Sequence, residues 1–219
     1  MAIKILIVDD HPLFRGALRL AAEGAVEAAE IREAADLDAA VAAIAAEPGL
    51  DLVLLDLNLP GAHGFSGLLL LRAQHPALPV IMVSGSAAPA TVSLAMQFGA
   101  AGFVPKTSSI EVMRAAFRQV LAGGSWTPPG AEIDSGADSE TAGLATKMAR
   151  LTPQQLRVLT MLSDGMLNKQ IAYALDVSEA TVKAHVSAIL QKLDVDSRTQ
   201  AVIAANRVMA LGQASAGPA

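Results

Sequence analysis

The feature that most constrains the fold is the recurrence of short apolar runs between segments with helical spacing. Three runs, IKILIV at 3–8, LVLL at 52–55 and PVIMV at 79–83, are rich in branched apolar residues and too short for buried helices. Runs of this kind are typical of parallel strands that are buried on both faces. Weaker strand signals at 31–34 and 102–104 bring the expected number of strands to five.

Helical patterns fill the intervals between these runs, at about 13–23, 37–46, 65–74, 89–98 and 108–122. Strands and helices that alternate at this spacing favour an open parallel sheet with helices on both faces and right-handed crossovers. We therefore expect a five-stranded, doubly wound α/β domain over residues 1–125.

The remainder of the chain changes character twice. Residues 126–149 are rich in Gly, Pro, Ser and acidic residues, which predicts a flexible acidic linker. Residues 150–211 carry only helical patterns and predict a small all-α domain, and residues 212–219 are expected to form a disordered tail.

Charge and composition narrow the classes of function. The formal net charge is -5, but residues 150–219 alone carry an excess of basic residues, so any contact with nucleic acid is expected there. The absence of cysteine excludes disulfides and thiolate metal sites. Residues 73–105 contain no charged residue, yet their prolines and glycines favour a buried α/β core over a membrane span. We expect a cytoplasmic protein with no membrane contact.

Polar side chains follow four of the expected strands, namely Asp9 and Asp10, Asp56, Ser84 and Lys106. The carboxyl ends of these strands meet at one edge of the sheet, which is where such folds place their chemistry. Clustered carboxylates repel one another, and a hard divalent cation with oxygen ligands, here Mg²⁺, relieves that repulsion. With a lysine as a second positive charge, the set suits phosphoryl transfer to a carboxylate.

Four motifs in this segment carry a family resemblance: VDDHP at 8–12, LLDLNLPGAHG at 54–64, VSGS at 83–86 and GFVPKTSS at 102–109. In this order they resemble the receiver domain of two-component response regulators, which has a flavodoxin-like fold. The resemblance implies that Asp56 accepts a phosphoryl group from a sensor histidine kinase.

The same resemblance implies roles for the surrounding residues. The Mg²⁺ ligands would be Asp9, Asp10, Asp56 and the backbone carbonyl of Asn58. Ser84 would hydrogen-bond a phosphoryl oxygen, Lys106 would pair with the phosphoryl group, and Phe103 falls at the aromatic switch position. His11, which follows the acidic pair, is expected to be a surface-loop residue.

The C-terminal segment predicts three helices with short turns. Thr152-Pro153 is a good helix start, Gly165 a good end, Asn168 an expected cap of the next helix, and Ser178 a cap of a longer one. Only the three residues DVS separate the last two helices. That spacing favours a helix-turn-helix, which places its second helix in the DNA major groove.

The longer helix has one apolar stripe, which we expect to be buried. The opposite side could contact base edges through Ala180, Lys183, Ala184, Ser187 and Gln191. Four further residues suit DNA phosphates: Lys169, Thr181, Lys192 and Arg198.

Residues 151–202 resemble the LuxR-type helix-turn-helix of the NarL/FixJ class of regulators, through LT, NKQIA, S..TVK.H...I..KL and SR. The resemblance implies that Lys183, Ala184 and Ser187 approach the bases. It also implies that a final helix, at about 198–209, supports dimerisation.

The leading hypothesis is a phosphorylation-controlled transcription regulator that binds double-stranded DNA as a homodimer and is not an enzyme acting on an external substrate. Two alternatives remain. One is an adaptor or phosphate sink whose helical domain binds a protein, and salt dependence of DNA binding separates it from the first. The other is a hydrolytic metalloenzyme, for which the sequence supplies no further substrate pocket.

Overall fold

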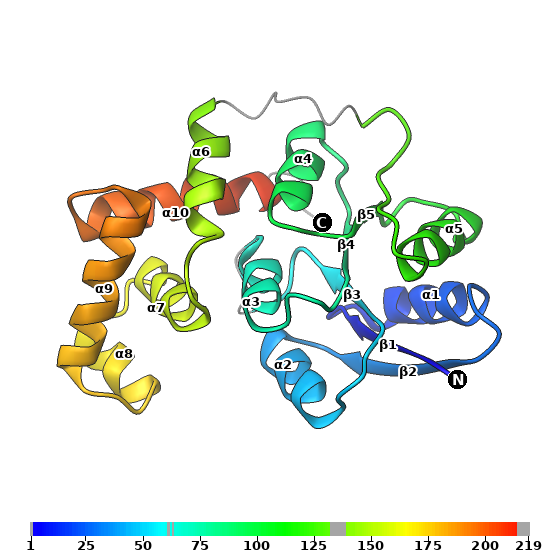
Figure 1. Ribbon diagram of the computed structural model, residues 1–219, viewed down its shortest axis with the longest axis horizontal. Helices are drawn as coiled ribbons and strands as arrows, with labels where there is room; N and C mark the ends of the chain where they lie inside the picture. Colours follow the sequence, from blue (N-terminus) through cyan, green and yellow to red (C-terminus); the bar gives the residue numbers. More distant parts are fainter. Residues whose placement is uncertain (1, 61, 63, 132–138, 214–219) are drawn as a thin grey trace.

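The N-terminal half of the chain forms a parallel sheet with helices on both faces (Figure 1). The computed structural model describes residues 2–60, 62, 64–131 and 139–213. The strands are β1 (Ile3–Val8), β2 (Ala29–Ala34), β3 (Leu52–Asp56), β4 (Val80–Ser84) and β5 (Gly102–Pro105). Their order is β2-β1-β3-β4-β5, and all neighbouring pairs are parallel. The five-stranded, doubly wound sheet that the sequence predicts is thus confirmed.

Five helices cover this sheet: α1 (Pro12–Glu23), α2 (Leu37–Ala46), α3 (Ser66–Gln74), α4 (Pro89–Gln97) and α5 (Ile110–Leu121). Successive residues of a strand point to opposite faces. In β1, Ile5 and Ile7 pack with α1 and α5, whereas Leu6 and Val8 pack with α2, α3 and α4. Burial on both faces explains why the central strands consist almost wholly of apolar residues.

The C-terminal half is helical: α6 (Ser139–Met148), α7 (Pro153–Ser163), α8 (Asn168–Ala174), α9 (Glu179–Leu193) and α10 (Arg198–Gln213). Thr152 and Gln155 form a reciprocal capping box at the start of α7. Ser178 caps α9 by accepting from the Thr181 N–H. Asn168 is not a cap as expected, because the helix begins at Asn168 itself and Leu167 holds the cap position.

The flexible linker predicted for 126–149 is wrong at both ends. Trp126 pairs with Gly102 beside β5, and its carbonyl accepts a hydrogen bond from the Phe103 N–H. Residues 139–148 form α6, in which Ala145 and Met148 are buried against the rest of the core. Long-range burial stabilises a helix whose local sequence shows little periodicity. Residues 132–138, and residues 214–219 of the predicted tail, lie outside the described residues.

The charge-free stretch 73–105 forms the end of α3, then β4, α4 and β5. Across the residues that the structure describes, every helix is too short or too polar to cross a bilayer.

The two halves of the molecule share one apolar core. It runs from the sheet through Leu68 of α3 and Phe98, which follows α4, to Leu156 of α7 and Met209 of α10. Figure 1 shows α7 beside α3, and α6 and α10 beside α4. The C-terminal helices therefore dock on the α3–α4 side of the N-terminal domain.

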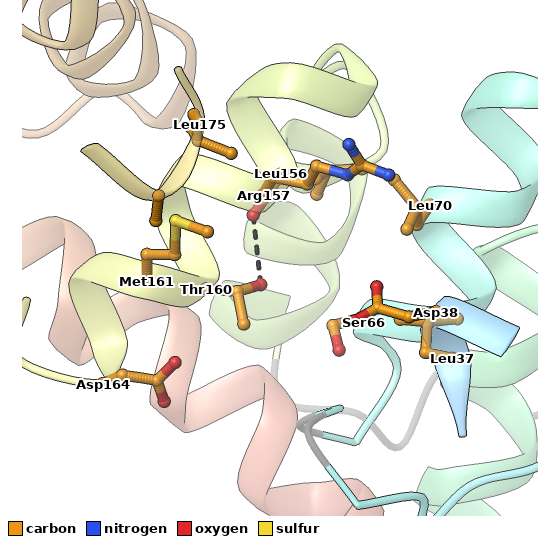
Figure 2. A pocket seen from close by; sticks show the side chains of 11 residues that line it. Leu37, Asp38, Ser66, Leu70, Leu156, Arg157, Thr160, Met161, Asp164 and Leu175 are labelled. Carbon is orange, nitrogen blue, oxygen red and sulfur yellow. Dashed lines mark hydrogen bonds between the residues drawn. The ribbon is translucent and has the colours of Figure 1, made fainter. Parts of the chain in front are cut away.

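A solvent-open cavity of about 350 Å³ interrupts this docking surface. Leu37 and Leu70 of the N-terminal domain line it on one side, and Leu156 and Met161 of α7 line it on the other (Figure 2). Polar and apolar side chains from both domains therefore face an open groove along this side of the interface. Interfaces between domains of one chain commonly resemble transient protein interfaces, which are less completely packed than a domain core.

Close backbone approach fixes one edge of the interface. Gly64, in the loop that follows β3, has a φ of +50°, and a Cβ on it would overlap the carbonyl oxygen of Met209 in α10. The loop that leaves Asp56 therefore touches the last helix directly, and only glycine fits there without displacing α10.

We expect Gly64→Ala to push α10 away and loosen the docking of the two domains. Small-angle X-ray scattering should show a larger radius of gyration than for the wild type. Gly49→Ala is the matched control, because Gly49 also has a positive φ but a Cβ on it would meet nothing within 4 Å. An unchanged radius in Gly64→Ala would mean that this contact does not hold the domains together.

Candidate functional site

The ends of the strands bring the predicted polar residues together. Asp9 and Asp10 follow β1, and Asp56 is the last residue of β3, which pairs with β1. Ser84 ends β4, and Lys106 directly follows β5. The sheet order reverses direction between β1 and β3, and such reversal points are where open α/β sheets bind ligands.

The ammonium of Lys106 lies between two buried carboxylates. Its Nζ is 2.7 Å from Asp9 Oδ2 and 2.8 Å from Asp56 Oδ2. Asp9 is fully buried and Asp56 is only 3% exposed. The ammonium also lies 4.8 Å from the centroid of the Phe14 ring, which covers it from the α1 side.

Burial is the largest influence on the pKa values of Asp56 and Lys106. It raises the pKa of Asp56, although the hydrogen bond from Lys106 opposes the shift. Burial alone would lower the pKa of Lys106, but the hydrogen bonds to Asp56 and Asp9 outweigh it and the pKa is raised. Lys106 therefore stays cationic at neutral pH.

The cluster has the composition of a site for a divalent cation. Ligand atoms of Asp9, Asp10, His11 and Asp56 all lie within 4.8 Å of one another. Among the described residues, Asp56 Oδ1 is buried and has no hydrogen-bond partner. Three carboxylates and one ammonium leave two negative charges in excess, which a single Mg²⁺ balances. The residues present thus fit the predicted metal.

A hollow of about 500 Å³ opens above the Asp56 carboxylate. Its walls, which define the Asp56 hollow, are His11, Leu13, Phe14, Asp56, Asn58, Gly85 and Lys106. Asn58, the predicted carbonyl ligand, therefore lies at the site. Ser84 and Phe103 are fully buried behind it, and the Ser84 carbonyl accepts a hydrogen bond from the Lys106 N–H at 2.7 Å.

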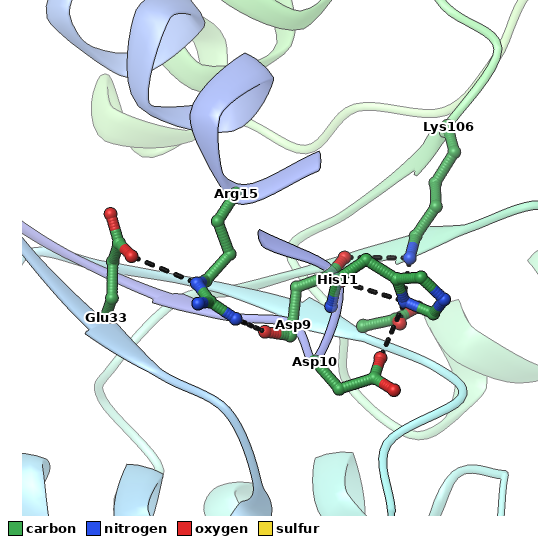
Figure 3. Close-up of polar contacts among 7 residues, drawn as sticks. Asp9, Asp10, His11, Arg15, Glu33 and Lys106 are labelled. Atoms are coloured by element: carbon green, nitrogen blue, oxygen red, sulfur yellow. Dashed lines mark hydrogen bonds and ion pairs between the residues drawn. The ribbon is translucent and has the colours of Figure 1, made fainter. Parts of the chain in front are cut away.

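Sequence reasoning missed Arg15 and favoured a surface-loop position for His11 over a place at this site (Figure 3). Arg15 donates from Nη1 to the carbonyl oxygen of Asp9 at 2.7 Å. His11 is exposed, as expected, but its Nδ1 also lies 2.7 Å from Asp10 Oδ1. The available signal was that Pro12 starts a helix immediately after the acidic pair, so the first turn of α1 has to cover the site.

The second candidate site is the exposed face of α9. Six of the residues predicted for DNA contact on this helix are solvent-exposed, namely Ala180, Thr181, Lys183, Ala184, Ser187 and Gln191. Val182, Ile189 and Leu193 are buried, and Val186 is partly buried, so the predicted apolar stripe is confirmed. Lys169 on α8 is also exposed.

Two residues predicted to contact DNA phosphates, Lys192 and Arg198, form hydrogen bonds inside the helical domain instead. Lys192 Nζ donates to the Arg150 carbonyl at 2.9 Å and to Gln155 Oε1 at 2.8 Å. Arg198 donates to the Met166 carbonyl and to Asn168 Oδ1. These contacts hold helices together, and a role at DNA phosphates stays a prediction for both residues.

The raised pKa of Asp56 predicts that Asp56→Asn stabilises the metal-free protein. Ionisation of Asp56 costs stability above its folded-state pKa, and no such cost exists below its ordinary pKa. The variant should therefore melt at a higher temperature at pH 7 in a chelating buffer, and the gain should shrink as the pH falls. One kcal/mol corresponds to about 2–4 °C for a chain of this size. A lower melting temperature would mean that the Lys106 ion pair outweighs burial.

Comparison with known proteins agrees with this geometry. The sequence family described as "Response regulator receiver domain" matches residues 5–118, and "Bacterial regulatory proteins, luxR family" matches residues 149–205. The Glycerol metabolism activator of Pseudomonas putida is 44% identical, covering 94% of this chain and 96% of its own. The nitrate/nitrite response regulator protein NarP of Escherichia coli is 34% identical, covering 91% and 93%.

Solved structures share the fold. The RcsB response regulator of Salmonella typhimurium superposes with a TM-score of 0.55 at 21% identity, over 94% of this chain and 99% of its own. The chain therefore belongs to the two-component response regulators of the NarL/FixJ class, DNA-binding transcription regulators in which a receiver domain precedes a LuxR-type helix-turn-helix domain.

Proposed function

We propose that phosphoryl transfer to Asp56 switches the C-terminal domain into a dimeric, DNA-binding state. The observation that carries the proposal is the unpartnered Oδ1 of Asp56 in a buried acidic cluster under the Asp56 hollow. A phosphohistidine of a sensor kinase is the donor: the Asp56 carboxylate forms the new O–P bond, the N–P bond breaks, and the imidazole leaves. The product is an acyl phosphate on Asp56.

The chain's own residues position this transfer. Asp9, Asp10, Asp56 and the Asn58 carbonyl would hold Mg²⁺, which neutralises charge on the phosphoryl oxygens when bound. Lys106 supplies a second positive charge, since its Nζ already lies 2.8 Å from Asp56 Oδ2. Ser84 provides a hydroxyl one strand away, at the end of β4.

Phosphorylation changes the partners of Lys106 and Ser84. Asp56 and Ser84 lie at the ends of β3 and β4, whose following helices, α3 and α4, form the docking side of the receiver. The loop after Asp56 reaches α10 at Gly64, and the loop after β4 leads to α4, which also contacts α10. We take the docked arrangement as the unphosphorylated state and the released arrangement as the active one. A switch needs two such discrete states of one interface.

Release would expose the part of α10 that meets the receiver. Helix α9 lies on the side of the helical domain far from the receiver (Figure 1), whereas α10 contacts α4 and the Met209 carbonyl meets Gly64. A freed α10 offers this surface to a second copy of the chain. The segment from 150 onward carries only a small basic excess, so pairing two copies is an effective way to raise the affinity for DNA.

The first test compares DNA binding with and without a small phosphoryl donor, for the wild type and for Asp56→Asn. We expect the donor to increase the fraction of shifted DNA only for the wild type, with a complex that contains two protein chains. The measurement is a gel shift on DNA selected from random sequences. Equal binding in all four reactions would contradict control by phosphorylation. No binding at any salt concentration would favour the alternative in which the helical domain binds a protein.

The second test concerns the face of α9. We expect Lys183→Gln to weaken DNA binding and to reduce the slope of log affinity against log salt by about one if the ammonium contacts a phosphate, or to relax sequence preference if it contacts a base. Lys147→Gln on α6 is the control, because Lys147 pairs with Asp194 away from this face. Equal affinity, slope and sequence preference for both variants would exclude Lys183 from the interface. Fluorescence anisotropy at several salt concentrations measures all three.

A further inference from the structure

Arg15 joins the acidic pair to the neighbouring strand. Its Nη1 donates to the Asp9 carbonyl at 2.7 Å, and its Nε donates to Glu33 Oε2 at 3.0 Å (Figure 3). Glu33 belongs to β2, the strand beside β1. The guanidinium thus bridges α1, the end of β1 and β2 within one turn of the acidic cluster.

The hydrogen bond from Arg15 to the Asp9 carbonyl lies where the backbone hydrogen bonds between β1 and β2 end. The Asp9 N–H donates to the Ala34 carbonyl at 3.1 Å, which is the last backbone bond between this end of β1 and β2. The chain then turns into α1, and Arg15 supplies the donor for the next carbonyl, that of Asp9. A buried carbonyl left without a donor is costly, so the guanidinium has a defined task there.

Two further contacts hold the side chain of Asp9. Its Oδ1 accepts a hydrogen bond from the His11 N–H at 2.8 Å, and its Oδ2 pairs with Lys106. With its N–H, carbonyl and carboxylate all bonded, Asp9 has little freedom. The same contacts hold the peptide that joins Asp9 to Asp10, and the Asp10 carboxylate has its own contact with His11 Nδ1.

The charge of Arg15 does not oppose a bound cation. Glu33 pairs with both Arg15 and Arg19, and the hydrogen bond from Arg19, followed by that from Arg15, holds the pKa of Glu33 below its ordinary value. Glu33 is therefore ionised, and together with Glu23, which pairs with Arg19, it balances the charges of the two guanidinium groups. Arg15 acts on the site through its hydrogen bond geometry.

We propose that Arg15 is a positioning residue for the metal and phosphoryl site, and that it sets the Mg²⁺ affinity by holding the Asp9 carbonyl while Glu33 holds its guanidinium. The inference rests on the proposed function in one respect, namely that Mg²⁺ binds the acidic cluster. Partners that orient metal ligands in this way typically contribute about 10–100-fold to metal affinity.

The chain offers a matched control in Arg19. It lies one turn further along α1, bonds the same Glu33 through Nε and Nη2, and pairs with Glu23 rather than with Asp9. Arg15→Met and Arg19→Met both remove a bond to Glu33, so a merely structural role would affect both variants alike. Only Arg15→Met removes the donor to the Asp9 carbonyl.

The experiment is a titration of the full chain with Mg²⁺ alone. Binding is monitored through the backbone amide shifts in NMR spectra. We expect Arg15→Met to bind Mg²⁺ about tenfold more weakly than the wild type, Arg15→Lys to recover part of the loss, and Arg19→Met to match the wild type. Thermal unfolding in chelating buffer reports how far each variant loses stability apart from the metal.

Three results would overturn the inference: equal affinity in Arg15→Met and wild type, tighter binding in Arg15→Met, or equal weakening in Arg15→Met and Arg19→Met. If Arg15→Met does not fold, Glu33→Gln decides, since it keeps Arg15 but loosens its anchor, and unchanged affinity there would also overturn the inference. A wild type that binds no Mg²⁺ would instead refute the metal site of the proposed function, so the two failures are distinguishable.

Discussion

The burial of Asp9 and Asp56 at adjoining strand ends is the constraint on which the rest of the site depends. Two carboxylates that lose their water must find positive charge or protons, and here the Lys106 ammonium reaches both within 2.8 Å. That ion pair requires β1, β3 and β5 to end at one level, which the parallel register provides. Because one ammonium leaves negative charge in excess, the same cluster has the charge to accept a divalent cation.

The interface between the two domains connects the acidic site to the C-terminal helices. The apolar core continues from the sheet into the C-terminal helices, yet a cavity of about 350 Å³ lies between α3 and α7. Such an interface combines a shared apolar core with an open groove. The last helix meets the receiver as well, because it contacts α4 and its backbone touches the loop that follows Asp56.

Local signals were sufficient for much of this architecture. The strands follow from short branched apolar runs, the starts of α7 and α9 from Thr152-Pro153 and Ser178, and the acidic site from aspartates placed directly after strands. Each of these signals acts over a few residues. By contrast, α6 was not recognised, because the burial of Ala145 and Met148 depends on contacts with distant helices.

The order of residues therefore determined the two folds and the residue types of both sites, since strand burial, helix caps and the β-α alternation are encoded within short windows. Only the tertiary structure decided which charged groups face which partners. Lys192 and Arg198 turn inward to backbone carbonyls, Arg15 completes the Asp9 turn, and α10 lies against the receiver. The reason is physical: hydrogen bonds to carbonyls and the burial of helix faces depend on where distant segments meet, and spacing along the chain does not specify that.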